Sequence, residues 1–218
     1  MPINLFILSR LIVERLSNQT LPVTNGYPQV LLKLLLNNFL FEIQKNIPSN
    51  HVWALILSDI SATYAKDPSC LTLWSVCRKQ GVKALIWFRL SAELPRFKAR
   101  FILRLLSTLY NIEIGFGAKI GPFCCIDHAN CVIIGQQVTL QRNVTLMHGV
   151  TLGSTGESVN AITVRHPTIM SGVYIGAHSM VLGSVTIGHC NVIAAGSVAL
   201  RSVLPWNVII GAPARLLC

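Results

Sequence analysis

Few residues of this chain carry a charge, and very few carry a negative one. Asp, Glu, Lys and Arg make up 12% of the 218 residues, and 8 acidic residues stand against 18 Lys and Arg, for a net charge of +10. Hydrophobic residues account for 52%. A chain of this composition buries much of its surface, partly between subunits, and its length allows one ordinary domain or two small ones.

Long apolar runs are also missing. The longest, around 30–43 and 84–90, are interrupted by polar or charged residues and fall short of a membrane span. The apolar start at 3–13 lacks a cationic lead and a small-residue cleavage site, which argues against secretion. The sequence therefore predicts no membrane partner.

Paired cysteines are absent as well. Their number, seven, is odd and no CxxC spacing occurs, so neither a disulfide framework nor a zinc ribbon is indicated. We expect a reducing, cytoplasmic environment.

The densest basic run, at 96–104, is typical of one solvated face of a helix rather than of a base-stacking surface, so nucleic acid is not an expected partner. The positive charge would instead suit the binding of a polyanionic small molecule.

The chain does contain a repeat of six residues from about residue 111 onward. This period is too long for a lone strand and does not match a helix. Each repeat supplies one short strand and a corner, and the anchors stack into an interior column. The aliphatic anchors are Ile114, Ile120, Ile126, Ile134, Leu140, Leu146, Leu152, Ile169, Ile175, Val181, Ile187 and Ile193.

The first half has a helical pattern instead, punctuated by Gly and Pro. We predict an α+β fold with an α-helical N-terminal domain at 1–110 and a parallel β-helix domain at 111–218. The expected helices are at 5–16, 29–45, 52–64, 71–79, 82–94 and 97–109.

The repeat breaks twice, by two residues after Ile126 and by a longer excursion between Leu152 and Ile169. Such breaks map to loops on one face, where function is usually placed. Asp127-His128 follows the anchor Ile126, next to the first break, and Arg165-His166 lies at the foot of the second. A histidine can accept a proton from a hydroxyl near neutral pH, and a carboxylate on its other nitrogen orients the ring.

A second histidine shares the position of His128 within its repeat. Counting through the two-residue slip, His148 holds the same position three repeats later. The two rings should therefore stack on adjacent coils. Either they form a ladder on the surface, or His148 contacts the acceptor pocket or shifts the acidity of His128.

Several motifs occur in an order that resembles the serine O-acetyltransferases of bacteria and plants. The resemblance runs from about residue 52 to 216, and it implies a left-handed β-helix with three hexads per coil, assembled as a trimer or a dimer of trimers. The repeats alone indicate only the hexapeptide-repeat acyltransferase superfamily, whereas the DHA and RHP motifs are more specific. The motifs are Asp67-Pro68, 81–85 with Arg89, 118–121, DHA at 127–129, 150–153 and RHP at 165–167.

The resemblance also implies roles for single residues. His128 is implied to be the general base that takes the proton of the serine hydroxyl, with Glu113 where the family has an orienting aspartate. Asp67 and Asp127 match the carboxylates that hold the substrate amine. Arg165 and His166 match the residues that contact its carboxylate, and His166 is counted with the catalytic groups. The acetyl-CoA groove is implied between coils, at Ser154, Thr155, Ala177, Ala195 and Arg201; no metal is implied.

The chain departs from the family at a few positions. Glu113 replaces the aspartate, and Ser154 replaces the second glycine of a Gly-Gly pair. The family's C-terminal tail, which docks into a sulfhydrylase, is missing, so a complex with that enzyme is not expected.

We expect acetyl transfer from acetyl-CoA to L-serine, a small-molecule acceptor. Three alternatives stay open. One is a related acyltransferase for another small hydroxylated or amino substrate in a specialised pathway. Another is a β-helix metal lyase with His128, His148 and His166 as ligands. The last is a non-enzymatic scaffold.

Overall fold

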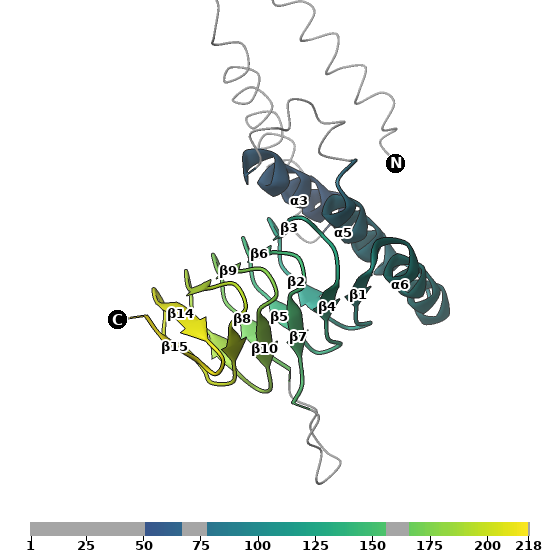
Figure 1. Ribbon diagram of the computed structural model, residues 1–218. Helices are drawn as coiled ribbons and strands as arrows, with labels where there is room; N and C mark the ends of the chain where they lie inside the picture. The colour runs from purple at the N-terminus through teal and green to yellow at the C-terminus, as the bar shows by residue number, and fades with distance from the viewer. Residues whose placement is uncertain (1–50, 67–77, 156–165, 218) are drawn as a thin grey trace, which may run out of the picture. The chain divides into compact units, whose positions relative to one another are not determined.

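Three helices precede the strands in the part of the chain that the computed structural model describes, residues 51–66, 78–155 and 166–217 (Figure 1). These residues belong to one compact unit, Leu36–Cys218. The helices are α3 (Val52–Lys66), α5 (Gln80–Ser91) and α6 (Arg96–Tyr110), and they match those predicted at 52–64, 82–94 and 97–109. The helices predicted at 5–16 and 29–45, and most of that at 71–79, lie outside the described residues.

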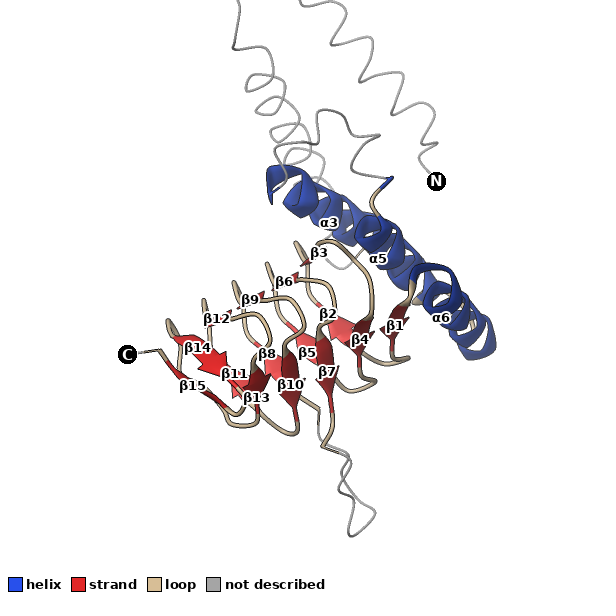
Figure 2. Ribbon diagram, viewed as in Figure 1, coloured by secondary structure: helices blue, strands red, loops and turns tan. Residues whose placement is uncertain are grey.

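After α6 the chain winds as a β-solenoid in which successive strands join three parallel sheets in turn (Figure 2). The first sheet holds β1 (Ile112–Ile114), β4 (Val132–Ile134), β7 (Thr151–Gly153), β10 (Met180–Leu182) and β13 (Val198–Ala199). The second holds β2 (Lys119–Ile120), β5 (Thr139–Leu140), β8 (Thr168–Ile169) and β11 (Thr186–Ile187). The third holds β3 (Cys125–Ile126), β6 (Thr145–Leu146), β9 (Tyr174–Ile175), β12 (Val192–Ile193), β14 (Val208–Gly211) and the antiparallel β15 (Ala214–Leu216).

The six-residue anchors form the interior of this solenoid. Ile114, Ile134, Leu152 and Val181 stand in register on successive strands of the first sheet. Every predicted anchor is buried, and the most exposed of them, Ile120, shows 8% of its surface. The predicted α+β architecture, helices followed by a parallel β-helix, is confirmed.

The corners between the sheets carry the polar residues of interest. We call the turns from the first sheet to the second the first corner (115–118, 135–138, 154–155 with 166–167, 183–185 and 200–202). We call the turns from the third sheet to the first the third corner (127–131, 147–150, 176–179 and 194–197). In each coil the third corner contains a residue of positive φ, namely Cys131, Gly149, His178 and Gly196.

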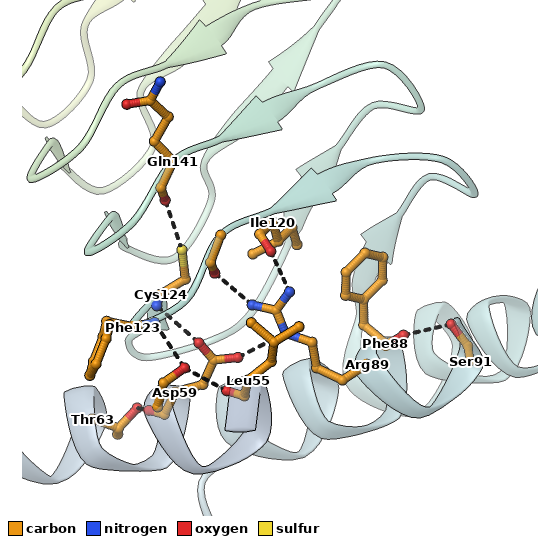
Figure 3. A network of polar contacts seen from close by, with 12 residues as sticks. Leu55, Asp59, Thr63, Phe88, Arg89, Ser91, Ile120, Phe123, Cys124 and Gln141 are labelled. Carbon is orange, nitrogen blue, oxygen red and sulfur yellow. Dashed lines mark hydrogen bonds and ion pairs between the residues drawn. The ribbon is translucent and has the colours of Figure 1, made fainter. Parts of the chain in front are cut away.

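A buried ion pair joins the helices to the first coil (Figure 3). The Arg89 Nε of α5 donates to the Asp59 Oδ2 of α3 over 3.1 Å, and the guanidinium also donates to the carbonyls of Ile120 and Gly121. Asp59 Oδ1 accepts the Cys124 amide over 3.0 Å. Burial raises the pKa of Asp59 to about 6, although Arg89 lowers it. The network fixes α3 and α5 against the strand that leads into the third corner.

Glycine allows α5 to approach that strand closely. A Cβ added at Gly81 would lie 2.0 Å from the carbonyl oxygen of Ile126, so no larger residue fits without a shift of backbone. Ile126 directly precedes Asp127 and His128. Among the described helices, none has the length and apolar character needed to cross a bilayer.

Candidate active site

Three histidines form a column along the third corner. The rings of His128 and His148 have centroids 6.3 Å apart and lie nearly perpendicular, at 89°. The His148 and His178 centroids are 4.9 Å apart, at 88°. The predicted stacking of His128 on His148 is confirmed, and His178 extends it by one coil.

His128 forms one end of this column, and His178, which is also exposed, forms the other. Its side chain is 72% exposed, and its Nε2 lies 4.0 Å from Asp127 Oδ2. Its backbone N–H donates to Asp127 Oδ1 over 3.0 Å, and its φ of 47° is in the left-handed region. The ring can therefore be reached by a solvent-borne hydroxyl while one carboxylate stays beside it.

Asp127 has a second charged neighbour. The Lys79 Nζ, just before α5, lies 3.7 Å from Asp127 Oδ1. The Asp127 side chain is about one third exposed. This carboxylate thus already holds one ammonium group and remains open to another.

Side-chain and backbone hydrogen bonds hold the corner that carries His128. Asn111 Nδ2, at the end of α6, donates to Asn130 Oδ1 over 2.9 Å. The amide of Gly149 on the next coil donates to the Asn130 carbonyl over 2.8 Å. The two-residue slip in the repeat is therefore an ordered turn, tied to the helix before it and the coil after it.

His148 and His178 are held by close contacts. His178 N–H donates to the His148 carbonyl over 2.9 Å. A Cβ on Gly149 would lie 2.3 Å from His178 Nδ1, so the ring occupies the space that only glycine leaves. His148 Nδ1 is buried and finds no hydrogen-bond partner among the described residues. The repeat count could have found His178, because it stands one coil on from Gly149 in the same register.

Glu113 lies on the first sheet rather than at a corner. It is exposed on β1 and pairs in register with Ile133 of β4. Within the described residues, no ion pair joins it to His128, whose carboxylate neighbour is Asp127. Within a single chain, the side chains of Glu113 and His128 therefore do not form an ion pair.

The residues of the second break lie at the first corner. The His166 ring packs over Gly135, where an added Cβ would be 2.3 Å from its Cδ2. His166 Nδ1 is buried and has no hydrogen-bond partner in the described part of the chain. Thr155 at the same corner approaches Gly183, whose added Cβ would lie 3.3 Å from its Cγ2. Asp67 and Arg165 lie outside the described residues.

The remaining candidates divide between the two corners. Ala177 and Ala195 belong to the third corner, where the Gly196 amide donates to the Ala177 carbonyl over 2.8 Å. Ser154 is at the first corner, as is Arg201, which is exposed. In a single chain, the first sheet therefore separates His128 from His166.

The metal-lyase alternative requires a cluster of ligands. Across the described ranges, no three His, Cys, Asp or Glu side chains are grouped so as to hold a metal ion. His128 and His148 share a corner, whereas His166 lies on another. The three histidines considered as metal ligands, His128, His148 and His166, are thus not brought together within one chain.

Comparisons with known proteins point to a single family. A serine acetyltransferase of Helicobacter pylori is 40% identical over 107 residues, which is 47% of this chain and 61% of that enzyme, so the match spans less than two thirds of its length. The serine acetyltransferase of Buchnera aphidicola is 31% identical over 185 residues, 82% of this chain and 70% of the relative. No family model matches the chain.

Solved structures agree with the sequence comparisons. Serine acetyltransferase from Brucella abortus in complex with coenzyme A has a TM-score of 0.72 at 28% identity, over 97% of this chain and 88% of that one. Soybean serine acetyltransferase complexed with serine has a TM-score of 0.71 at 29% identity, over 98% and 91%. The repeat, the helices, the two corners and these similarities together show that the chain belongs to the serine acetyltransferase family.

Proposed function

We propose that this protein transfers the acetyl group of acetyl-CoA to the hydroxyl of L-serine, with His128 as general base. The observation that carries the proposal is the exposed His128 beside Asp127, on a β-solenoid whose relatives are solved with coenzyme A and with serine. The product would be O-acetylserine, a precursor for cysteine biosynthesis, as the family resemblance implies.

The chemistry needs one base and close positioning. His128 takes the hydroxyl proton as the oxygen attacks the thioester carbonyl carbon. The carbon–sulfur bond then breaks, and the CoA thiolate takes the proton from the imidazolium. The thioester is already activated, so positioning the two substrates together supplies much of the rate.

A zwitterionic acceptor would be held at both ends. Asp127, with Asp67, would bind the ammonium group, and the exposure of Asp127 beside Lys79 supports such a role. Arg165 and His166 would bind the carboxylate. Glu113 would orient His128, a contact that requires a side-chain movement or a neighbouring subunit, since the two are not paired within one chain.

Acetyl-CoA would lie along the coils where side chains are small. Ala177 and Ala195 leave the backbone of the third corner accessible, and Ser154 and Thr155 do so at the first. Arg201 is an exposed cation for the phosphates. A net charge of +10 suits a polyanionic cosubstrate.

Because the candidate residues lie on two corners, we further propose that the site is completed between subunits of a trimer. A third corner of one subunit would face a first corner of its neighbour, as symmetric oligomers allow. The domain division at residue 110 and a cytoplasmic setting remain predictions from the sequence.

One observation supports a second candidate acceptor. The His148–His178 pair fills the third corner behind His128 with two further imidazoles. These groups suit an acceptor with more polar groups than serine. Another small hydroxylated substrate is therefore the second candidate.

The test is thiol release from acetyl-CoA in the presence of a panel of hydroxy amino acids and sugars. We expect L-serine to give the highest kcat/KM, and His128→Ala to lower turnover by roughly two to four orders of magnitude without loss of fold. His189→Ala, an exposed histidine away from both corners, is the control. Unchanged turnover in His128→Ala would remove this residue from the mechanism, and preference for a sugar would establish the second candidate.

A further inference from the structure

Helix α6 carries an exposed apolar row that nothing in the described part of the chain covers. Phe97 and Phe101 are each 70% exposed, Leu105 is 46% and Leu109 61% exposed. These residues follow one another at intervals of four, so they lie along one face of the helix. The opposite face, with Ala99, Leu103 and Leu106, is buried. Packing on α5 and β1 therefore accounts for only one side of α6 (Figure 2).

A row of cations runs beside the apolar row. Arg96, Arg100 and Arg104 are also spaced by four, one position before each of the first three apolar residues, and all are exposed. Lys98 adds a fourth cation, with its Nζ 5.8 Å from the centroid of the Phe97 ring. No acidic residue occurs between Arg96 and Tyr110, and the flanking Glu93 and Glu113 each stand three positions outside the helix.

We propose that this surface, Phe97, Phe101, Leu105 and Leu109 with Arg96, Lys98, Arg100 and Arg104, docks the protein onto an anionic lipid bilayer. Helices that lie in the membrane interface have an apolar face with aromatic residues and a polar face rich in Lys and Arg. The apolar row enters the boundary between headgroups and acyl chains, while the arginines meet the lipid phosphates. The attachment is peripheral, and it departs from the prediction of no membrane partner, which rested on the lack of a membrane-spanning apolar run and of a secretion signal.

Charge favours a bilayer over a second copy of this chain. Two α6 helices packed through their apolar rows would bring their arginine rows together, and α6 has no carboxylate to neutralise them. Like charges placed opposite each other destabilise such a contact. An anionic bilayer supplies the missing negative charge along the whole helix.

Vesicle flotation tests the proposal with the intact protein. We expect it to float with vesicles of phosphatidylglycerol and phosphatidylcholine, and to stay at the bottom with phosphatidylcholine alone. Phe97→Ser with Phe101→Ser should abolish flotation. Arg96→Gln with Arg104→Gln should weaken apparent affinity by about 25-fold, because each cation near the surface contributes a factor of about five. Trp206→Ser, another exposed aromatic, and Lys119→Gln with Arg142→Gln are the matched controls.

Each possible result of the flotation experiment either supports or overturns the proposal. Flotation that α6 variants lose and control variants keep supports the proposal. A wild-type protein that stays with the pellet at low salt overturns it, as does equal flotation of all variants. A fall in oligomeric mass of Phe97→Ser with Phe101→Ser in light scattering, without vesicle binding by the wild type, would instead assign the row to a contact between subunits.

Discussion

At the scale of single residues, the backbone conformation at the corners of the β-solenoid determines which positions can hold a histidine. His178 has a φ of 56° at a corner position that Gly149 and Gly196 fill in the coils on either side. A residue with a Cβ in this region costs about 1 kcal/mol or more relative to glycine. The close contact with His148 is the visible compensation. This contact holds the His178 ring beside His148, which is in turn the neighbour of His128.

The sequence predicted part of this column and missed part. His128 and His148 emerged from counting positions in the repeat, because the count fixes which side chains are stacked. His178 was missed because it stands one position later in its repeat than His128 and His148 do in theirs, opposite Gly149. The positions of Asp67 and Arg165 remain predictions, since both fall outside the described residues.

The role of His148 can be tested by truncation. We expect His148→Ala to lower kcat/KM for acetyl transfer by about tenfold, because the edge of its ring positions His128. The KM for acetyl-CoA should change little. The same steady-state assay on His189→Ala supplies the control. If His148→Ala behaves as this control does, the column is a surface ladder without a part in the reaction.

Glu113 offers a second test at this scale. We expect Glu113→Gln to lower kcat by about ten- to a hundredfold, because a carboxylate that orients and stabilises an imidazolium is lost. Acetyl-CoA affinity, measured by calorimetry, should stay nearly the same. Glu113→Asp restores the residue typical of the family but shortens the side chain, so partial activity is expected. Full activity in Glu113→Gln would leave Asp127 as the carboxylate that acts on His128.

At the scale of elements, the repeat was predictable and its attachment to the helices was not. Each strand follows from one buried aliphatic residue every six positions, a requirement that local sequence displays directly. The contact of α3 with the first coil depends on Asp59, Arg89 and Cys124, which are far apart in the sequence. Nothing local to Asp59 distinguishes it from an exposed acid on a helix.

The buried carboxylate makes stability depend on pH. The pKa of Asp59 is about 6 in the folded chain, because burial outweighs the attraction of Arg89, and about 3.9 when unfolded. The folded state therefore binds more protons between these values. Its contribution to stability is fully present below about pH 4 and is lost as the pH rises through 6, by roughly 3 kcal/mol.

Urea unfolding of the wild type and Asp59→Asn between pH 4 and pH 7.5 measures this contribution. The free energy of unfolding of the wild type minus that of the variant should fall as the pH rises through 6. Subtraction of the variant removes the titration of other groups that both proteins share. A difference that grows with pH would mean that the attraction of Arg89 exceeds the cost of burying Asp59.

At the scale of the whole molecule, the separation of the two corners is the main constraint. His128 belongs to the turns between the third and first sheets, and His166 to the turns between the first and second. A β-solenoid cannot bend to bring two of its own corners together, because every coil is hydrogen-bonded to the next. If both residues act on one substrate, they must come from two subunits.

Mixed oligomers test this arrangement. We expect His128→Ala and His166→Ala, produced separately, to be nearly inactive. When the two are co-expressed with different affinity tags and purified through both, only mixed trimers remain. In each mixed trimer about a third of the sites, one in three, should combine an intact His128 from one subunit with an intact His166 from its neighbour. Thiol release should then recover to about that fraction of the wild-type rate. Co-expression of the double variant with His128→Ala is the control, because it cannot form such a site. Mixed trimers of verified mass that remain as inactive as either parent would place the complete site within a single subunit.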